Sequence, residues 1–362
     1  MTRFHCLGAE CEGTCCAGVA VPVDQASHVR LKVFAQTDAV ARELVERAVV
    51  LTPQGPGYGE LRFESGNCAM LDPSGLCRIH ARFGNDGLFE VCATYPRYFS
   101  RIDAELELYG TLSCPEVARL VLLDDDAFEQ SEEPDQHPRK LRNSFETSAP
   151  YYRPFRQVRE GLLKVLDAPG QDVRTRLFAL LWVSDKLRPV LHDKCGPVLL
   201  AEVEGALQTA SRAGMQAQLG ATLRELAIDK GLLHSITSHV LERSESVNGL
   251  ARAAEIPAWV RERLESYLAR YAKNCVLTTP YMLFPSLFAY VSDLVLKVAL
   301  LRAELERRLA GFTGSEEDLA RTVVAVVFRF VRRLEHTDVV GRVSEQLAAQ
   351  GLNSFAHTVC LL

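Results

Sequence analysis

Apolar residues recur every three or four positions through most of residues 151–362, which is the period of α-helices with one buried face. The clearest stretch is 316–335, where a leucine- and valine-rich stripe alternates with arginines. Ser315 precedes it and Asp318 follows three residues later, an aspartate version of the capping box. The same reasoning predicts helices over 155–167, 172–188, 197–213, 215–229, 231–244, 257–274, 281–310, 316–335 and 338–350.

The first 120 residues lack this regularity and are rich in glycine, proline and cysteine. Helical spacing predicts one helix within Asp24–Val50, and short strands are expected at Glu60–Glu64 and Leu106–Leu112. Residues 121–150 are acidic and broken by prolines, as expected of a solvated linker. We therefore expect a mainly α protein. An irregular, Cys-rich, metal-binding N-terminal lobe with few short strands (1–120) is followed by an acidic linker (121–150) and an all-helical C-terminal lobe (151–362).

Composition and charge argue against two classes of binding partner, nucleic acids and membranes. The chain has 362 residues, 48% of them hydrophobic and 24% charged, as in ordinary globular proteins. A formal charge of -5 argues against nucleic-acid binding through a basic groove. The longest uncharged run, Asn274–Ser292, contains Pro280 and Pro285, so we expect a helix pair broken at the prolines rather than a membrane span. We expect neither nucleic acid nor membrane as a partner.

Cysteine is the unusual feature of the composition. Eight of the 11 cysteines precede residue 115, a clustering that indicates either a disulfide framework or a metal site. No apolar leader follows the opening Met1–Cys6 segment, so we expect a cytoplasmic protein, in which a metal is the better explanation. The candidate metal ligands are Cys6, Cys11, Cys15, Cys16, Cys68, Cys77, Cys92 and Cys114.

The cysteine spacing leaves the kind of metal open. Zinc sites usually carry two closely spaced cysteine pairs, and only the Cys6–Cys16 segment is of that kind, although His80 beside Cys77 keeps a mixed site possible. The excess of thiols favours an iron–sulfur cluster. Because Cys15 is followed directly by Cys16, the Cys-x3-Cys-x2-Cys loop of radical adenosylmethionine enzymes is absent, and spacing alone does not select the ligands.

Other sequence motifs exclude several enzyme classes. Gly55, Gly57 and Gly59 follow the apolar Val49–Leu51, but the prolines among them and the missing acidic residue favour a flexible loop over the Gly-rich turn of Rossmann-like methyltransferases. The chain contains no Gly-x-Ser-x-Gly, phosphate-loop or His-Glu-x-x-His pattern. Common hydrolase and kinase functions therefore have no support.

The ordered motifs resemble the flagellin lysine-N-methylase family. They are Phe4-His5-Cys6, Cys11-Glu12-Gly13-Thr14-Cys15-Cys16, Asp24, Cys68-x2-Leu71, Gly75-Leu76-Cys77, Cys92-x2-Tyr95-Pro96-Arg97, Ser113-Cys114-Pro115-Glu116, Tyr271-x2-Asn274 and Arg333-Leu334-Glu335-His336. The N-terminal part also resembles a broader cysteine-cluster family of zinc- or iron-chelating domains. The resemblance implies a methyltransferase that uses S-adenosyl-L-methionine and carries a [4Fe-4S] cluster on the cysteines. It also implies a protein substrate with exposed lysines, flagellin or another protein.

The chemistry of amine methylation suggests further candidate residues. A free lysine amine has a pKa of about 10.4 and must lose its proton before it attacks a methyl group. Glu116 and Tyr95, each near a cluster cysteine, are the candidate catalytic residues, and Arg97 is the candidate for holding the donor's carboxylate. His336 is a further candidate base. A non-enzymatic zinc- or iron-binding module and an iron–sulfur redox protein remain as alternatives, although the helical lobe is larger than a bare metal carrier needs.

Overall fold

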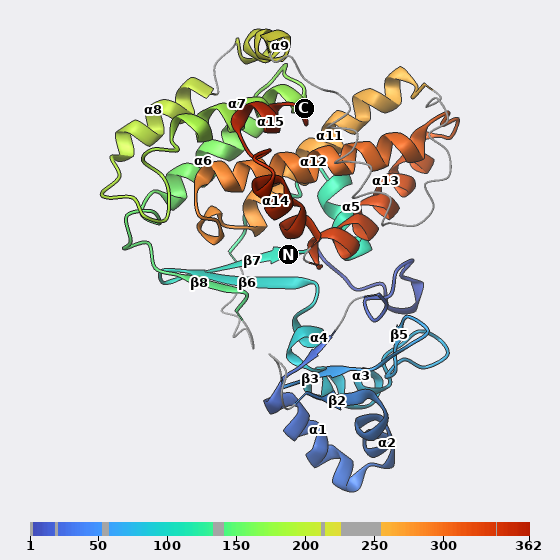
Figure 1. The fold of residues 1–362 in the computed structure, drawn as a ribbon. Coiled ribbons are helices and arrows are strands. Elements are labelled where there is room, and N and C mark those ends of the chain that lie inside the picture. Colours follow the sequence, from blue (N-terminus) through green and yellow to red (C-terminus); the bar gives the residue numbers. More distant parts are fainter. Residues whose placement is uncertain are drawn as a thin grey trace. The chain divides into compact units, whose positions relative to one another are not determined.

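The computed structural model describes residues 3–18, 21–52, 58–132, 141–210, 214–225, 255–337 and 339–362. Internal contacts divide the chain into two units. The N-terminal unit comprises Met1–Leu120 and Phe128–Ser144, and the helical unit comprises Val121–Ala127 and Phe145–Leu362. Figure 1 shows both, and each is described by itself. The fold is mainly α, as the periodicity predicted.

The N-terminal unit contains more regular structure than its sequence suggested. Its helices are α1 (Gln25–Thr37), α2 (Ala39–Ala48), α3 (Arg78–Phe83), α4 (Glu90–Thr94) and most of α5 (Pro115–Leu123), with 3-10 turns at Gly8–Glu10 and Gly84–Gly87. The single helix expected within Asp24–Val50 is wrong, because Asp38 separates α1 from α2. Its carboxylate accepts a hydrogen bond from the Ala41 N–H at 2.9 Å and so begins a new helix.

Short antiparallel strands complete this unit. The three sheets have the orders β1-β3-β2, β4-β5 and β7-β6-β8. Strand β6 was not predicted because its buried positions do not alternate along the strand. It nevertheless pairs with β7 along its whole length, with Arg97 opposite Gly110 at one end and Ile102 opposite Glu105 at the other. The strands are β1 (Pro22–Val23), β2 (Val49–Leu51), β3 (Gly59–Leu61), β4 (Phe63–Glu64), β5 (Asn67–Cys68), β6 (Arg97–Ile102), β7 (Glu105–Gly110) and β8 (Asn143–Phe145).

The helical unit follows the predicted pattern with local corrections. Its elements are α6 (Phe155–Leu166), α7 (Val173–Lys186), α8 (Leu200–Ala210), α9 (Met215–Glu225), α11 (Ala258–Thr278), a 3-10 turn (Tyr281–Leu283), α12 (Leu287–Leu309), α13 (Glu316–Phe330), a π-helix (Val331–Glu335), α14 (Val339–Ala349) and α15 (Phe355–Val359). The helix predicted over 231–244 lies outside the described residues. The predicted capping box of Ser315 and Asp318 is confirmed.

Two predicted helix boundaries were wrong. The helix expected at 281–310 begins only at Leu287, because Pro285 cannot continue a helix and the Ser286 hydroxyl caps the new one through the Ala289 N–H at 3.1 Å. The helix expected at 316–335 changes to a π-helix at Val331. Among the described residues no helix is long and apolar enough to cross a membrane, and the Asn274–Ser292 run is interrupted at its prolines.

Helix α7 lies at the centre of the helical unit. Val173, Leu177 and Leu181 are buried on one side of the helix, and Thr175 and Phe178 are buried on the other. It packs against α6, α8, α9, α11, α12 and α15 (Figure 1). A helix with buried residues around most of its circumference is typical of the centre of a bundle, and the exposed Arg174 and Lys186 lie near its two ends.

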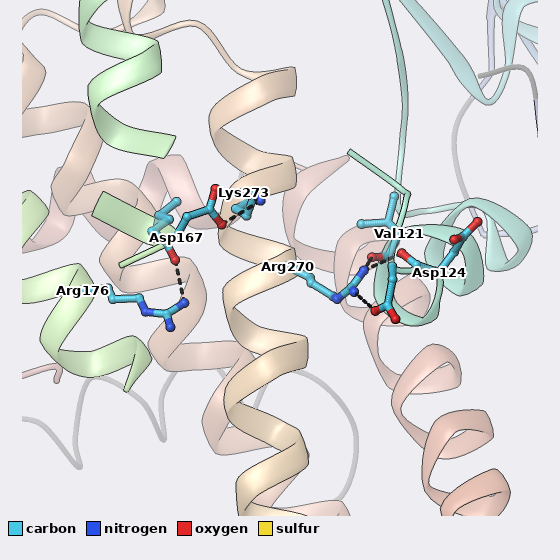
Figure 2. A network of polar contacts seen from close by, with 8 residues as sticks. Val121, Asp124, Asp167, Arg176, Arg270 and Lys273 are labelled. Carbon is cyan, nitrogen blue, oxygen red and sulfur yellow. Dashed lines mark hydrogen bonds and ion pairs between the residues drawn. The ribbon is translucent and has the colours of Figure 1, made fainter. Parts of the chain in front are cut away.

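Polar side chains of α11 hold neighbouring segments in place (Figure 2). The Arg270 guanidinium donates to the carbonyl oxygens of Val121 at 3.3 Å and Asp124 at 2.6 Å, at the C-terminal end of α5. The Lys273 ammonium donates to the Asp167 carboxylate at 2.8 Å, just after α6. Helix C-termini leave carbonyl groups unsatisfied, and cations stabilise them. Arg270 and Lys273 therefore link α11 to two helix ends.

Candidate functional site

Four of the predicted metal ligands lie on one core of the N-terminal unit. Cys68 is buried in this core, and Cys16, Cys77 and Cys92 pack against it half-buried. The Cys68 N–H donates to the Cys16 carbonyl at 2.8 Å, which joins the N-terminal loop to β5. Cys77 immediately precedes α3, and Cys92 lies on α4. The fold thus gathers thiols from four separate segments of the chain.

Cys15 is the thiol that influences most of the others. Its Sγ lies 3.9 Å from the Cys16 Sγ, and this hydrogen bond, together with burial, raises the pKa of Cys16 well above its ordinary value. Burial and nearby cysteines, Cys15 among them, also raise the pKa values of Cys68 and Cys92, and that of Cys114 to about 11. Without a cation beside them these thiols keep their protons, whereas metal ligation requires the thiolate.

These sulfur donors do not by themselves form a ligating arrangement. Among the described residues, no group of three or more His, Cys, Asp or Glu side chains is placed to hold a metal ion. Cys6 is exposed, and His80 is exposed on α3, so the structure gives neither a place in the core with the other thiols. Among the described residues the donors on this core are thiols, and thiolates are the ligands that soft metals and iron–sulfur clusters prefer.

Tyr95 and Ser113 bring two of the predicted segments together. The Tyr95 hydroxyl lies 3.2 Å from the Ser113 Oγ, which in turn lies 3.1 Å from the Thr111 Oγ1. Ser113 and Thr111 are buried, so the phenol ends a short chain of hydroxyl groups inside the N-terminal unit. The peptide bond from Tyr95 to Pro96 is cis, and the Pro96 carbonyl accepts a hydrogen bond from the Thr111 N–H at 3.0 Å.

Arg97 and Glu116 both have partners inside the N-terminal unit. The Arg97 guanidinium lies over the Phe4 ring, 5.6 Å from its centroid. Glu116, in the first turn of α5, forms an ion pair with Arg119, which also pairs with Glu12. Arg119 was not predicted as a site residue. Arg119 follows Glu116 by three residues, which places both on one face of a helix, and this spacing could have indicated the ion pair from the sequence.

Asp24 connects two helices beside the thiols. One carboxylate oxygen accepts from the Ser27 N–H at 2.7 Å and caps α1, and the other accepts from the Glu90 N–H at 3.0 Å at the start of α4. Burial acts to raise the pKa of Asp24, but these hydrogen bonds outweigh it and hold the pKa below its ordinary value. The cap therefore fixes α4, and with it Cys92.

Two of the motifs that carry the family resemblance, Tyr271-x2-Asn274 and Arg333-Leu334-Glu335-His336, meet in the helical unit. The Tyr271 hydroxyl donates to the Glu335 carboxylate, joining α11 to the π-helix. Tyr271 is fully buried, and burial raises its pKa well above the ordinary value. Lys297 and Asp293 of α12 form an ion pair, with 2.8 Å between the ammonium nitrogen and the carboxylate oxygen. The negative charge of Glu335 also acts to raise the pKa of Lys297. His336 is half-buried, and its backbone N–H donates to the Val331 carbonyl at 3.1 Å.

The chain is similar to curated proteins over part of its length. No family model and no solved structure matches the chain. Over 184 residues, half of this chain, it is 27% identical to the lysine-N-methylases of Salmonella typhimurium and Salmonella choleraesuis. The aligned part spans 44% of each of those proteins, less than half their length. Over 130 residues it is 32% identical to the flagellar biosynthetic protein FliU of Salmonella muenchen, of which 76% is covered.

Proposed function

Because the chain belongs to the family of the flagellar biosynthetic protein FliU, we propose that it is a protein-lysine N-methyltransferase. The observation that carries the proposal is the similarity to two proteins named lysine-N-methylase over half of the chain. S-adenosyl-L-methionine is the proposed donor, and lysine side chains of flagellin or of another protein are the proposed acceptors. Action in the cytoplasm is part of the proposal, because free thiols persist there.

The proposed reaction is a methyl transfer from sulfur to nitrogen. The lysine amine first loses a proton, and its lone pair then forms a bond to the donor's methyl carbon. The carbon–sulfur bond breaks, its electron pair stays on sulfur, and S-adenosylhomocysteine leaves. The protein must therefore bind the two substrates in line and accept one proton for each methyl transferred.

Glu116 and Tyr95 are the proposed residues that orient and deprotonate the amine. The Glu116 carboxylate is held in place by Arg119, and the Tyr95 hydroxyl is held by Ser113. Both side chains are thus positioned by neighbours within the N-terminal unit. A positioned carboxylate or phenol of this kind typically contributes about 100- to 10,000-fold to a proton transfer.

The gathered thiols support the proposal of a [4Fe-4S] cluster. Cys16, Cys68, Cys77 and Cys92 come from four segments to one core, and Cys15 lies against Cys16. When bound, the cluster supplies positive charge that balances the thiolates and gives the unit a redox centre. The protein's own residues would supply the thiolates, shield them from water and keep the four segments together.

The first test is anaerobic purification with an absorption spectrum and analysis for iron, sulfide and zinc. The proposal expects a brown protein with matched iron and sulfide. A colourless protein with stoichiometric zinc would favour a zinc-binding module.

The decisive test of activity uses the iron-loaded full chain. Calorimetry should detect binding of S-adenosyl-L-methionine, and mass spectrometry should detect flagellin peptides heavier by the mass of one or more methyl groups. Absence of donor binding by intact, iron-loaded protein would refute the methyltransferase proposal. Donor binding without a change in flagellin would retain the chemistry and exclude only that substrate.

A further inference from the structure

The N-terminal unit contains an open pocket beside the gathered thiols that no step above uses. Its volume is about 590 Å³, within the usual range for pockets that hold small ligands. Cys68 and Ala69, both buried, form part of its lining, and Thr14 lies at its edge just before Cys15. The pocket is therefore next to the thiols. Tyr95, Arg97 and Glu116 do not line it, but Glu116 pairs with Arg119, which also pairs with Glu12, two residues before the lining residue Thr14.

Arg78 contributes a positioned positive charge to this pocket. Glu43, on α2 and outside the pocket, accepts from both terminal nitrogens of Arg78 at 3.0 and 3.1 Å. The ion pair fixes the guanidinium and uses two of its five N–H donors. Within the described residues the Arg78 side chain has no other hydrogen bond, so its remaining donors are available to a ligand carboxylate.

Asp72 contributes a positioned negative charge to the same pocket. Its Oδ1 accepts from the Ser74 N–H at 2.8 Å, the Ser74 hydroxyl at 2.6 Å and the Leu76 N–H at 3.0 Å. These bonds hold the carboxylate in a tight turn, which Gly75 closes with a positive φ of 82°. All three bonds are made by Oδ1, and among the described residues no hydrogen bond reaches Oδ2, which is available to a further donor.

The rest of the lining is partly apolar. Leu71 and Pro73 lie in the wall with Asp72, and Arg47 and Glu64 neutralise one another through an ion pair at the rim. The pocket therefore combines one available cation, one available anion and an apolar surface. A ligand that carries an ammonium and a carboxylate on one carbon, joined to a larger group with some apolar surface, matches all three features.

We propose that this pocket binds S-adenosyl-L-methionine, with Arg78 contacting the carboxylate and Asp72 the ammonium of its amino-acid head group. The inference rests on the proposed methyl transfer and names the donor's site. Arg97, which the sequence suggested for the donor's carboxylate, lies over the Phe4 ring and does not line this pocket.

The test compares two arginines of the same helix in the iron-loaded full chain. Arg78→Ala removes the proposed head-group contact. Arg82→Ala removes an arginine of α3 that pairs with Asp38 and does not line the pocket. Calorimetry should show affinity for S-adenosyl-L-methionine and S-adenosylhomocysteine falling about 10- to 100-fold in Arg78→Ala. In Arg82→Ala it should stay within about twofold.

A truncated ligand separates a direct contact from a structural effect. Methylthioadenosine lacks the amino-acid head group, so Arg78→Ala should bind it as the unaltered protein does. Asp72→Asn keeps an oxygen for the turn and removes the charge, and it should likewise weaken only the ligands that carry the ammonium. Iron content and circular dichroism establish that each variant is folded.

The outcomes distinguish this inference from the proposed function. If the unaltered protein binds S-adenosyl-L-methionine and Arg78→Ala and Asp72→Asn bind it equally well, the pocket assignment is wrong and the methyltransferase proposal stands. An equal loss of methylthioadenosine binding would also overturn the assignment, because the effect would then be structural. If the unaltered iron-loaded protein binds no donor, both the assignment and the proposed function fail.

Discussion

Cys15 has the most connected position among the N-terminal thiols. It lies against Cys16, and its charge contributes to the raised pKa values of Cys68, Cys77, Cys92 and Cys114. Its Sγ is 3.9 Å from that of Cys16, whose backbone carbonyl accepts a hydrogen bond from the N–H of Cys68. It is therefore the thiol whose loss most directly tests whether this group binds a cluster.

Replacing Cys15 with serine should bleach the proposed cluster. Serine is a poor ligand for iron, so iron and sulfide content and the absorption of the anaerobically purified protein should fall severalfold. Cys195→Ser is the matched control, because Cys195 lies in the helical unit and should leave the spectrum unchanged. Equal iron content in the two variants would show that Cys15 is not a ligand.

Glu116 and Glu12 provide a second comparison at the residue scale. Both carboxylates pair with Arg119, but only Glu116 is proposed to act on the amine. Glu116→Gln should lower turnover about 100-fold with little change in donor affinity, since the proton acceptor is lost. Glu12→Gln removes the same kind of ion pair and should have a small effect on turnover. Similar kinetics in the two variants would assign Glu116 a structural role.

At the scale of elements, the π-helix brings a charged group to the inside of the helical unit. A π-turn inserts one residue into a helix and often occurs at functional sites. Here it places Glu335 to accept a hydrogen bond from the buried Tyr271, near the Lys297–Asp293 ion pair. Burial acts to lower the pKa of Lys297, but the charges of Asp293 and Glu335 outweigh it and hold the pKa above its ordinary value.

Loss of the Lys297 charge should destabilise the helical unit. Lys297→Met leaves Asp293 buried without its partner, which typically costs about 3–5 kcal/mol in the free energy of unfolding. The exposed Lys164→Met on α6 is the control and should change it by less than about 0.5 kcal/mol. Urea unfolding followed by circular dichroism measures both.

A double variant separates charge from packing. Lys297→Met combined with Asp293→Leu removes both charges and should recover most of the lost free energy of unfolding. If the double variant is as unstable as Lys297→Met alone, packing of the Lys297 side chain rather than its charge is what the helical unit requires.

At the scale of the whole molecule, the two units depend on different forces. The helical unit has a continuous apolar core around α7 and α12. The N-terminal unit has a smaller core in which thiols take several of the positions. Metal binding stabilises a fold when its ligands are brought together only in the folded state. The N-terminal unit is therefore the part whose stability should depend on iron.

Removal of iron by an anaerobic chelator should expose the N-terminal unit to proteases. Limited proteolysis with mass spectrometry should find new cleavage sites before about residue 120, while the segment after Phe145 stays protected by its own core. Re-addition of iron and sulfide should restore protection. Simultaneous cleavage throughout both units would contradict their independent stability.

The helices of the C-terminal half follow from the sequence alone. Their apolar stripes depend on residues three and four positions apart, and their ends depend on nearby caps and breaks such as Ser315, Asp318 and Pro285. Asp38 shows the limit of this reasoning. A polar residue within a helical pattern can cap a new helix instead of continuing the first one.

Only the tertiary structure decided which residues from distant parts of the chain meet. Cys16 and Cys68 are 52 positions apart and join through a backbone hydrogen bond, while Tyr271 and Glu335 are 64 apart and join through their side chains. The pocket with Arg78 and Asp72 likewise depends on loops without periodicity. The sequence by itself determined the local elements, because each is stabilised by neighbours along the chain. The site required the fold, because contacts between distant segments leave no repeating pattern in the sequence.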